Sequence, residues 1–177
     1  MICKNKKDFD FSNAKNILNK SLSRNYYWIR REFPYKNVKP QIMAEEYMTD
    51  DTGNQLKDYK IFVFGGKAEY IQVDYDRFTD HHRNFYSRDW EYLPFTTLYP
   101  TNKDKIIERP KKLEELLGAA EKISNTLRNP SFLRVDFYVV EDKIYFGEVT
   151  FYHGAGVEKF YPNEYNYILG EKIVLKK

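Results

Sequence analysis

The sequence predicts an α+β fold in which an antiparallel β-sheet is flanked by helices. Two pairs of β-rich runs, 59–64 with 67–73 and 132–140 with 143–151, are each joined by a short connection, as in β-hairpins. Between the two pairs, leucines at helical spacing predict an amphipathic helix over residues 110–127. Sequence-adjacent strands in hairpins, mixed with helices, are typical of α+β proteins with antiparallel sheet.

The remaining elements are shorter. Residues 12–24 read as an amphipathic helix, and residues 162–169 as a second short helix near the end of the chain. Residues 41–48 are expected to form a strand that ends in the acidic, turn-forming stretch 50–53. Gly65-Gly66 lies between the first pair of β-rich runs and predicts a tight hairpin turn there, because such a turn needs positive φ, which glycine adopts readily.

Composition and charge restrict the class of protein. The 177 residues are enough for one domain with its own core, so we expect residues 1–177 to form a single domain. A net charge of +3 is too small to indicate nucleic acid or an anionic membrane as a partner. No apolar run approaches the ~20 residues of a membrane span. The single cysteine, Cys3, favours a reducing compartment, and the N-terminus lacks a signal-peptide pattern, so we expect a cytoplasmic protein.

Two carboxylates on the second hairpin are the first candidate site. Strand alternation puts Arg134 and Asp136 on the same face. If Val140 pairs with Ile144 around a three-residue loop, Asp136 lies directly opposite Glu148. Facing carboxylates repel unless a proton, a cation or solvent relieves the repulsion. Spacing alone therefore leaves two interpretations open, a Mg²⁺ site and a solvated polar face of the sheet.

The order of the residues around this pair resembles the final strands of ATP-grasp enzymes. Arg134-Val135-Asp136 is followed by Glu148, by Thr150 and by the small-residue loop Gly154-Ala155-Gly156. The resemblance implies that Asp136 and Glu148 bind Mg²⁺ and that Arg134 contacts the phosphoryl group being transferred. Thr150 stands where the family usually has a metal-binding Asn, and its hydroxyl is implied as a third metal ligand.

An earlier part of the chain resembles the nucleotide-binding elements of the same enzymes. Residues 44–48 look like the hinge strand that receives adenine, and the implied contacts are Glu45, Glu46, Tyr47 and Met48. Asp58-Tyr59-Lys60 resembles the element that follows the hinge. There Asp58 is implied to take the ribose hydroxyls, and Lys60 is implied to act as a point charge on phosphate.

More narrowly, nearly the whole chain resembles the TupA-like ATP-grasp group, which is associated with teichuronopeptide and other cell-surface polysaccharide synthesis. The stretches that support this are 32–36, 44–47, 58–62, 76–78, 83–86, 134–138 and 146–152. The resemblance implies an ATP- and Mg²⁺-dependent carboxylate–amine ligase whose substrates offer a carboxylate and an amine. Because no Gly precedes Gly53, the Gly-rich phosphate loop is missing. We therefore expect the C-terminal portion of such an enzyme, which is either a fragment or a chain whose N-terminal half is supplied by a separate chain.

The long polar stretch 76–109 holds candidate substrate contacts. Arg77, Arg83 and Asn84 could face a carboxylate or an acyl phosphate, and the alternative is a solvated loop. His153, beside the last glycines, is a further candidate for a substrate contact, and a structural role is the alternative.

Two rival functions remain at the level of sequence. One is a metal-dependent glycosyltransferase, for which Asp74-Tyr75-Asp76 matches an Asp-x-Asp motif. The other is a catalytically inert remnant that binds nucleotide. A preceding βαβ unit, which a nucleotide-sugar site would need, is not predicted.

Overall fold

A computed structural model describes residues 1–49, 56–77 and 79–175. The chain divides into two compact units, Met1–Met48 (unit 1) and Thr49–Lys177 (unit 2), and each unit is described by itself.

Unit 1 contains short helices joined by irregular chain. The helices are α1 (Phe11–Leu22), α2 (Tyr27–Arg30) and η1 (Phe33–Tyr35). The predicted helix 12–24 is therefore present, one residue earlier at its start and two earlier at its end. Asp10 caps α1, because its carboxylate accepts a hydrogen bond of 2.9 Å from the backbone N–H of Asn13.

Residues 41–48 differ from the sequence prediction. They form no strand in the described part of the chain and have no regular secondary structure. A strand needs a neighbouring strand for its backbone hydrogen bonds, and in this stretch only Ile42 and Tyr47 belong to the residue types enriched in strands. The expected turn at 50–53 lies outside the described residues.

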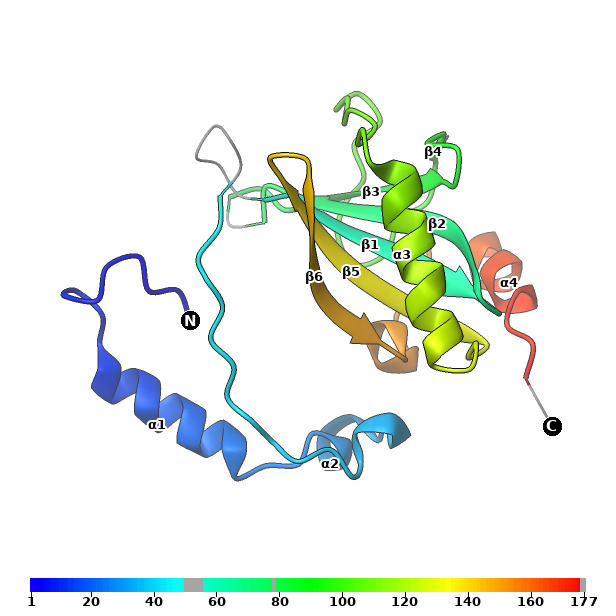
Figure 1. The fold of residues 1–177 in the computed structure, drawn as a ribbon. Coiled ribbons are helices and arrows are strands. Elements are labelled where there is room, and N and C mark those ends of the chain that lie inside the picture. Colours follow the sequence, from blue (N-terminus) through cyan, green and yellow to red (C-terminus); the bar gives the residue numbers. More distant parts are fainter. Residues whose placement is uncertain (50–55, 78, 176–177) are drawn as a thin grey trace. The chain divides into compact units, whose positions relative to one another are not determined.

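Unit 2 is built on a six-stranded antiparallel sheet with flanking helices, which confirms the predicted fold class (Figure 1). The strands are β1 (Asp58–Phe64), β2 (Lys67–Tyr75), β3 (His82–Ser87), β4 (Tyr92–Leu93), β5 (Phe132–Val140) and β6 (Lys143–Thr150). Their order across the sheet is β4-β3-β2-β1-β5-β6, so the two predicted hairpins lie side by side, with β1 against β5.

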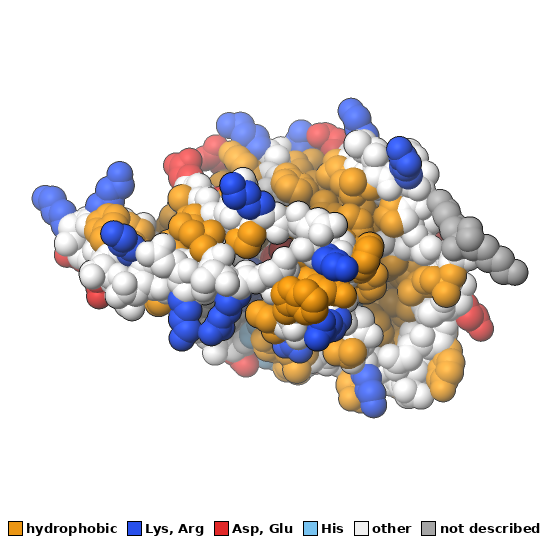
Figure 2. All heavy atoms as spheres, turned by 90° about the horizontal axis from the view of Figure 1, so that it is seen from below, with side chains coloured by type: hydrophobic (Ala, Val, Ile, Leu, Met, Phe, Trp, Pro, Cys, Tyr) orange, Lys and Arg blue, Asp and Glu red, His pale blue; other side chains and the backbone are white. Residues whose placement is uncertain are grey.

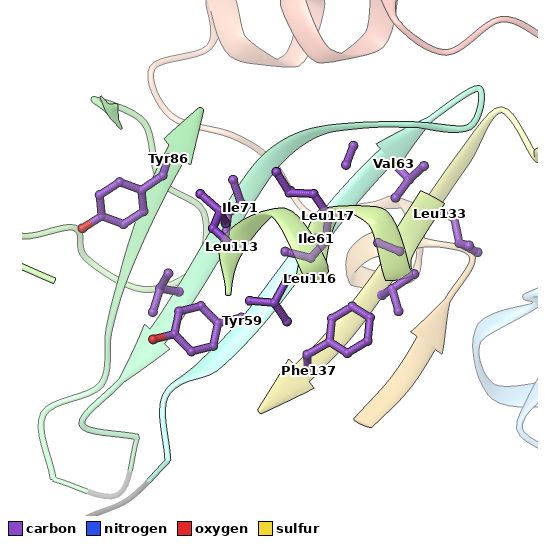
Figure 3. Close-up of a cluster of buried hydrophobic side chains, with 14 of the residues drawn as sticks. Tyr59, Ile61, Val63, Ile71, Tyr86, Leu113, Leu116, Leu117, Leu133 and Phe137 are labelled. Carbon is purple, nitrogen blue, oxygen red and sulfur yellow. The ribbon is translucent and has the colours of Figure 1, made fainter. Parts of the chain in front are cut away.

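One face of the sheet carries the larger hydrophobic core, under helix α3 (Leu113–Thr126) (Figures 1 and 3). Leu113, Leu116, Leu117 and Ala120 recur at helical spacing, and all four are fully buried. They pack against alternate residues of the strands, among them Tyr59, Ile61, Val63, Ile71, Leu133, Val135 and Phe137. The predicted helix 110–127 is thus confirmed, beginning three residues later than expected.

The opposite face has an apolar part and a polar part. The apolar part is a second core in which Leu169 of helix α4 (Glu164–Glu171) packs with aromatic side chains. Its buried members are Phe62, Phe64, Phe85, Phe95 and Leu169. The polar part begins where β1 changes from Phe62 to Lys60 and Asp58 on the same face. The short helix η2 (His153–Gly156) lies next to both parts, since the His153 ring is 5.0 Å from that of Phe62.

The second hairpin reaches the predicted pairing by a different route. Its turn has two residues, Glu141 and Asp142, both with positive φ, and Val140 pairs with Lys143. The predicted three-residue loop was therefore wrong. A β-bulge after Asp136 then shifts the register by one residue, so Asp136 still pairs with Glu148.

The surface mixes charged and apolar side chains. Figure 2 shows Lys and Arg side chains dispersed among hydrophobic patches over one side of the molecule. Among the described helices, none is both long and apolar enough to cross a membrane.

We expect Ile61→Ala to lower the free energy of unfolding of unit 2 by about 2–5 kcal/mol, because Ile61 is fully buried under α3. Ile106→Ala is the matched control, since Ile106 is 87% exposed, and it should change stability by less than about 0.5 kcal/mol. Urea denaturation measures both. Equal effects of the two substitutions would contradict the assignment of the core.

The double substitution Glu141→Asn with Asp142→Gly should stabilise the second hairpin by about 1 kcal/mol. Both positions have positive φ, which Asn and Gly adopt at lower cost than Glu and Asp. Thermal denaturation is the measurement. Glu141→Gln keeps the strained backbone and should leave the melting temperature unchanged, and a loss of stability in the double variant would show that the turn has another geometry.

Candidate functional site

Polar and charged side chains from five strands gather on the sheet face opposite α3. Strand alternation puts every second residue on this face, and antiparallel pairing aligns those residues across the strands. They form one row of Gln72, Lys60, Asp136 and Glu148, and a neighbouring row of Arg83, Asp74 and Asp58. These seven residues, together with Arg134, are named the polar cluster.

Lys60 lies at the centre of the polar cluster. Its Nζ is 2.6 Å from Asp58 Oδ2 and 2.5 Å from Asp136 Oδ2, and all three side chains are almost completely buried. Taking these charges out of water is costly, and only close pairing compensates for it. Loss of any one partner would leave an uncompensated buried charge.

Arg134 holds both carboxylates of the second hairpin. Its Nε donates to Asp136 Oδ1 at 2.7 Å and its Nη2 to Asp136 Oδ2 at 2.8 Å, a bidentate arrangement. The same Nη2 donates to Glu148 Oε1 at 3.1 Å. Partial desolvation, followed by the charge of Asp136, raises the pKa of Glu148 above its ordinary value. The side chain of Glu148 is nevertheless 62% exposed, so a ligand can reach it.

Asp58 has one oxygen paired and one left over. Oδ2 accepts from Lys60 and from Arg77 Nη1, the latter at 3.2 Å. Oδ1 is buried, and no residue in the described part of the chain gives it a hydrogen bond. Burial raises the pKa of Asp58, and the Lys60 cation offsets this only in part. A buried acceptor without a donor costs free energy, so this oxygen is suited to a donor from a ligand.

Arg83 is committed to partners within the protein. Its Nε donates to Asp74 Oδ1 at 2.6 Å and its Nη2 to Asp74 Oδ2 at 3.2 Å. Its Nη1 donates to the Thr97 hydroxyl and, at 3.2 Å, to Glu158 Oε1. Since every nitrogen of the guanidinium has a partner and the side chain is 9% exposed, Arg83 braces the edge of the polar cluster. Arg77 is the more accessible arginine, with a side chain that is 38% exposed.

The other sequence candidates lie in different places. Thr150 pairs with Arg134 across the sheet, beside the polar cluster. Asn84 faces the α3 side instead, fully buried, where its side chain binds the backbone of Asn102. The proposed adenine contacts, Glu45, Glu46, Tyr47 and Met48, belong to unit 1, where they have no regular secondary structure.

Sequence reasoning missed Gln72, Thr97 and Glu158 as members or neighbours of this site. Gln72 gave a usable signal, because strand alternation puts it on the same face as Asp74, two residues later. Its Nε2 donates to Asp74 Oδ1 at 3.1 Å. Thr97 and Glu158 come from irregular segments, where no periodicity indicates which way a side chain points.

The Asp-x-Asp interpretation of residues 74–76 gains no support from the geometry. Asp74 is buried and paired with Arg83. Asp76 is half exposed and forms an ion pair with Lys105 at 3.8 Å. The two carboxylates therefore serve different partners and do not converge on a shared ligand position.

Asp136 and Glu148 suit a Mg²⁺ ion whose other ligands are phosphate oxygens and water better than one bound by protein side chains alone. In the described residues, no three His, Cys, Asp or Glu side chains converge as a metal-ligand set. Asp136 and Glu148 nevertheless pair across the strands and supply the carboxylate oxygens that Mg²⁺ prefers. Mg²⁺ commonly takes one or two carboxylates and completes its shell with phosphate and water, which this pair allows.

Comparison with known families decides the classification. The family model described as TupA-like ATPgrasp matches residues 1–174, essentially the whole chain. The chain belongs to the TupA-like ATP-grasp family. Searches among curated proteins and among solved structures each gave no match.

Family membership agrees with the fold of unit 2, an antiparallel sheet with flanking helices. ATP-grasp proteins generally bind ATP and Mg²⁺. The polar cluster of this TupA-like chain combines cations suited to phosphate with carboxylates suited to Mg²⁺, on one face of one sheet.

The ion pair between Asp74 and Arg83 should make stability depend on pH. Burial alone would raise the pKa of Asp74, but the hydrogen bonds and charge of Arg83 hold it below its ordinary value of 3.8. A carboxyl with a lowered folded-state pKa stabilises the protein above its unfolded pKa. That contribution is lost as the pH falls through the lower, folded value.

We expect Asp74→Asn to cost about 3–5 kcal/mol near neutral pH, because it removes the bidentate carboxylate of buried Arg83 and leaves it only the longer contact with Glu158. The stability difference from wild type should shrink between about pH 5 and about pH 2. Urea denaturation over this range measures it. Asp80→Asn is the control, with a side chain that is 85% exposed, and a pH-independent difference for Asp74→Asn would contradict the pairing.

Proposed function

We propose that this chain is the nucleotide- and metal-binding part of an ATP- and Mg²⁺-dependent carboxylate–amine ligase. The observation that supports this most directly is the convergence of Lys60, Arg134, Asp136 and Glu148 on one sheet face. Two cations and two carboxylates within ion-pair distance are the groups needed to hold a metal–triphosphate complex.

The charge balance of the site supports an exchange of partners. Lys60, Arg77 and Arg134 are paired with Asp58, Asp136 and Glu148, so three positive groups face three negative ones. On ligand binding, Asp136 and Glu148, with the Thr150 hydroxyl, would hold Mg²⁺. Lys60 and Arg134 would then turn from these carboxylates to phosphate oxygens. No buried charge loses its partner in this exchange, which keeps the desolvation cost low.

The proposed contacts to the nucleoside are of two kinds, one to the ribose and one to the adenine. Asp58 Oδ1, a buried acceptor without a partner among the described residues, is suited to a ribose hydroxyl. Glu45, Glu46, Tyr47 and Met48 remain our proposal for the adenine contacts, on the basis of the family resemblance.

The reaction we propose has two transfers. A substrate carboxylate oxygen attacks the γ-phosphorus of ATP and ADP leaves, which gives an acyl phosphate. An amine nitrogen then attacks the acyl carbon, phosphate leaves, and the amine proton passes to solvent. Lys60 and Arg134 would offset the charge that develops on the transferred group. Mg²⁺, when bound, would supply further positive charge to the phosphate oxygens.

The acceptor side of the site would use Arg77. Its guanidinium contacts Asp58 yet stays partly exposed, so it can bind a carboxylate or acyl phosphate at the edge of the polar cluster. Arg83, with every nitrogen engaged, would instead fix the shape of that edge. We further propose that the product belongs to cell-surface polysaccharide or teichuronopeptide-type polymer synthesis, and that the protein acts in the cytoplasm.

Calorimetric titration of the chain with Mg·ATP, metal-free ATP and Mg·UDP-glucose tests this proposal. We expect Mg·ATP to bind most tightly. Glu148→Gln should weaken Mg·ATP binding about tenfold or more, because one charged contact is worth about 1.5–3 kcal/mol. Its effect on metal-free ATP should be smaller.

Glu91→Gln, at an exposed glutamate of unit 2, is the matched control and should bind Mg·ATP as wild type does. Tighter binding of Mg·UDP-glucose would favour a glycosyltransferase. The absence of any nucleotide binding would contradict the ligase and favour an inert chain.

A further inference from the structure

His153 is enclosed on every side by residues of the site. Its ring lies 5.0 Å from the ring of Phe62 and 5.6 Å from that of Phe160, and its side chain is 8% exposed. Its Nδ1 is 3.2 Å from Arg134 Nη1, and its Nε2 is 3.1 Å from Glu158 Oε2. Because the side chain is almost completely buried, this placement favours the structural alternative for His153 over a substrate contact.

The partners determine which ring nitrogen carries the proton. An arginine guanidinium only donates, so Nδ1 must be the acceptor in its contact with Arg134. The proton of a neutral ring is then on Nε2, which faces the Glu158 carboxylate, although the angle between them falls short of a full hydrogen bond. Burial lowers the pKa of His153 to about 4, so the ring is neutral near pH 7.

Glu158 lies between His153 and Arg83, the residue at the edge of the polar cluster. Its Oε1 accepts from Arg83 Nη1 and from the backbone N–H of Leu98, each at 3.2 Å. The chain between His153 and Glu158 turns through Gly154 and Ala155, both with positive φ. A Cβ at Gly154 would lie 2.2 Å from Glu158 Cβ, so this close turn requires glycine. Ala155 has a positive φ, which is unfavourable for a residue other than glycine, and the turn that contains it places Glu158 beside the His153 ring.

We propose that His153 and Glu158 are positioning residues that hold the Arg134 guanidinium in place for the phosphate of ATP. This inference rests on the proposed function of the site. Arg134 needs such support, because it must release Asp136 to contact phosphate and still keep its orientation. The contact from His153 Nδ1 lies on Nη1, away from the Nε and Nη2 atoms that bind Asp136.

Two substitutions of similar size separate positioning from packing. In His153→Asn the amide oxygen can take the place of Nδ1 and accept from Arg134. In His153→Gln the amide nitrogen can take the place of Nε2 and face Glu158, while Arg134 loses its acceptor. Both variants remove the ring from between Phe62 and Phe160, so their thermal stabilities should fall by similar amounts.

The first readout needs no nucleotide. ¹⁵N NMR of the histidine ring should show an unprotonated Nδ1 and a protonated Nε2 in wild type. The slowly exchanging Nη1–H signal of Arg134 should be present in wild type and His153→Asn, and lost in His153→Gln. The Nε–H signal, which reports the bond to Asp136, should stay in all three proteins. A protonated Nδ1, or an Arg134 Nη1–H signal that is the same in all three proteins, would overturn the positioning role.

The second readout is calorimetric titration with Mg·ATP. His153→Gln should bind about tenfold more weakly than wild type, and His153→Asn within about threefold of it. Equal weakening in both variants would show that only ring packing matters, and would overturn the proposal. Wild-type protein that does not bind Mg·ATP would overturn the proposed function and the phosphate role of the contact together. In that case the NMR signals still decide whether His153 holds Arg134.

Discussion

β1 and β5 are neighbours in the sheet, although 76 positions of sequence separate Lys60 from Asp136. Their pairing sets Lys60 opposite Asp136 and Phe62 opposite Arg134, and so unites the halves of the site. The side-chain period of a strand is two, so a slip of one residue would turn Lys60 toward α3. Ile61 and Val63, fully buried under α3, oppose that slip, because it would expose them on the polar face. The hydrophobic core therefore fixes the register of the charged cluster.

Much of this arrangement could be predicted from local patterns. The alternation in 132–140 and the spacing to Glu148 gave the correct pair of carboxylates, but the loop length behind the prediction was wrong. A two-residue turn at Glu141 and Asp142 displaces the register one way, and the bulge after Asp136 restores it. Gly147 makes the bulge possible, since a Cβ there would lie 3.1 Å from the Asp136 carbonyl oxygen. The register shift from the two-residue turn and the shift from the bulge cancel, and the periodicity of the sequence reveals neither of them.

Other features were beyond local reasoning, because their partners are distant in sequence. β3 was not predicted, since its central Arg83 and Asn84 are both polar and both buried, on opposite faces of the sheet. Each is satisfied by a separate partner, Asp74 for the first and the backbone of Asn102 for the second. Residues 41–48 show the converse. They were expected to form a strand, yet they have no regular secondary structure, because strand structure depends on a neighbour that the local sequence does not reveal.

The division of the second sheet face explains how so many buried charges are tolerated. Phe62, Phe85 and Leu169 exclude water beside the polar cluster, which strengthens each ion pair and also raises the cost of leaving one unmade. Well-packed apolar residues usually stabilise a fold at least as well as buried ion pairs do, so stability alone does not require these charges. The apolar half and the α3 core supply the stability, and the polar half keeps paired charges close to a surface that ligands can reach. Glu148, paired with Arg134, and Arg77, paired with Asp58, are both exposed in part, and at these two residues the network of paired charges meets solvent.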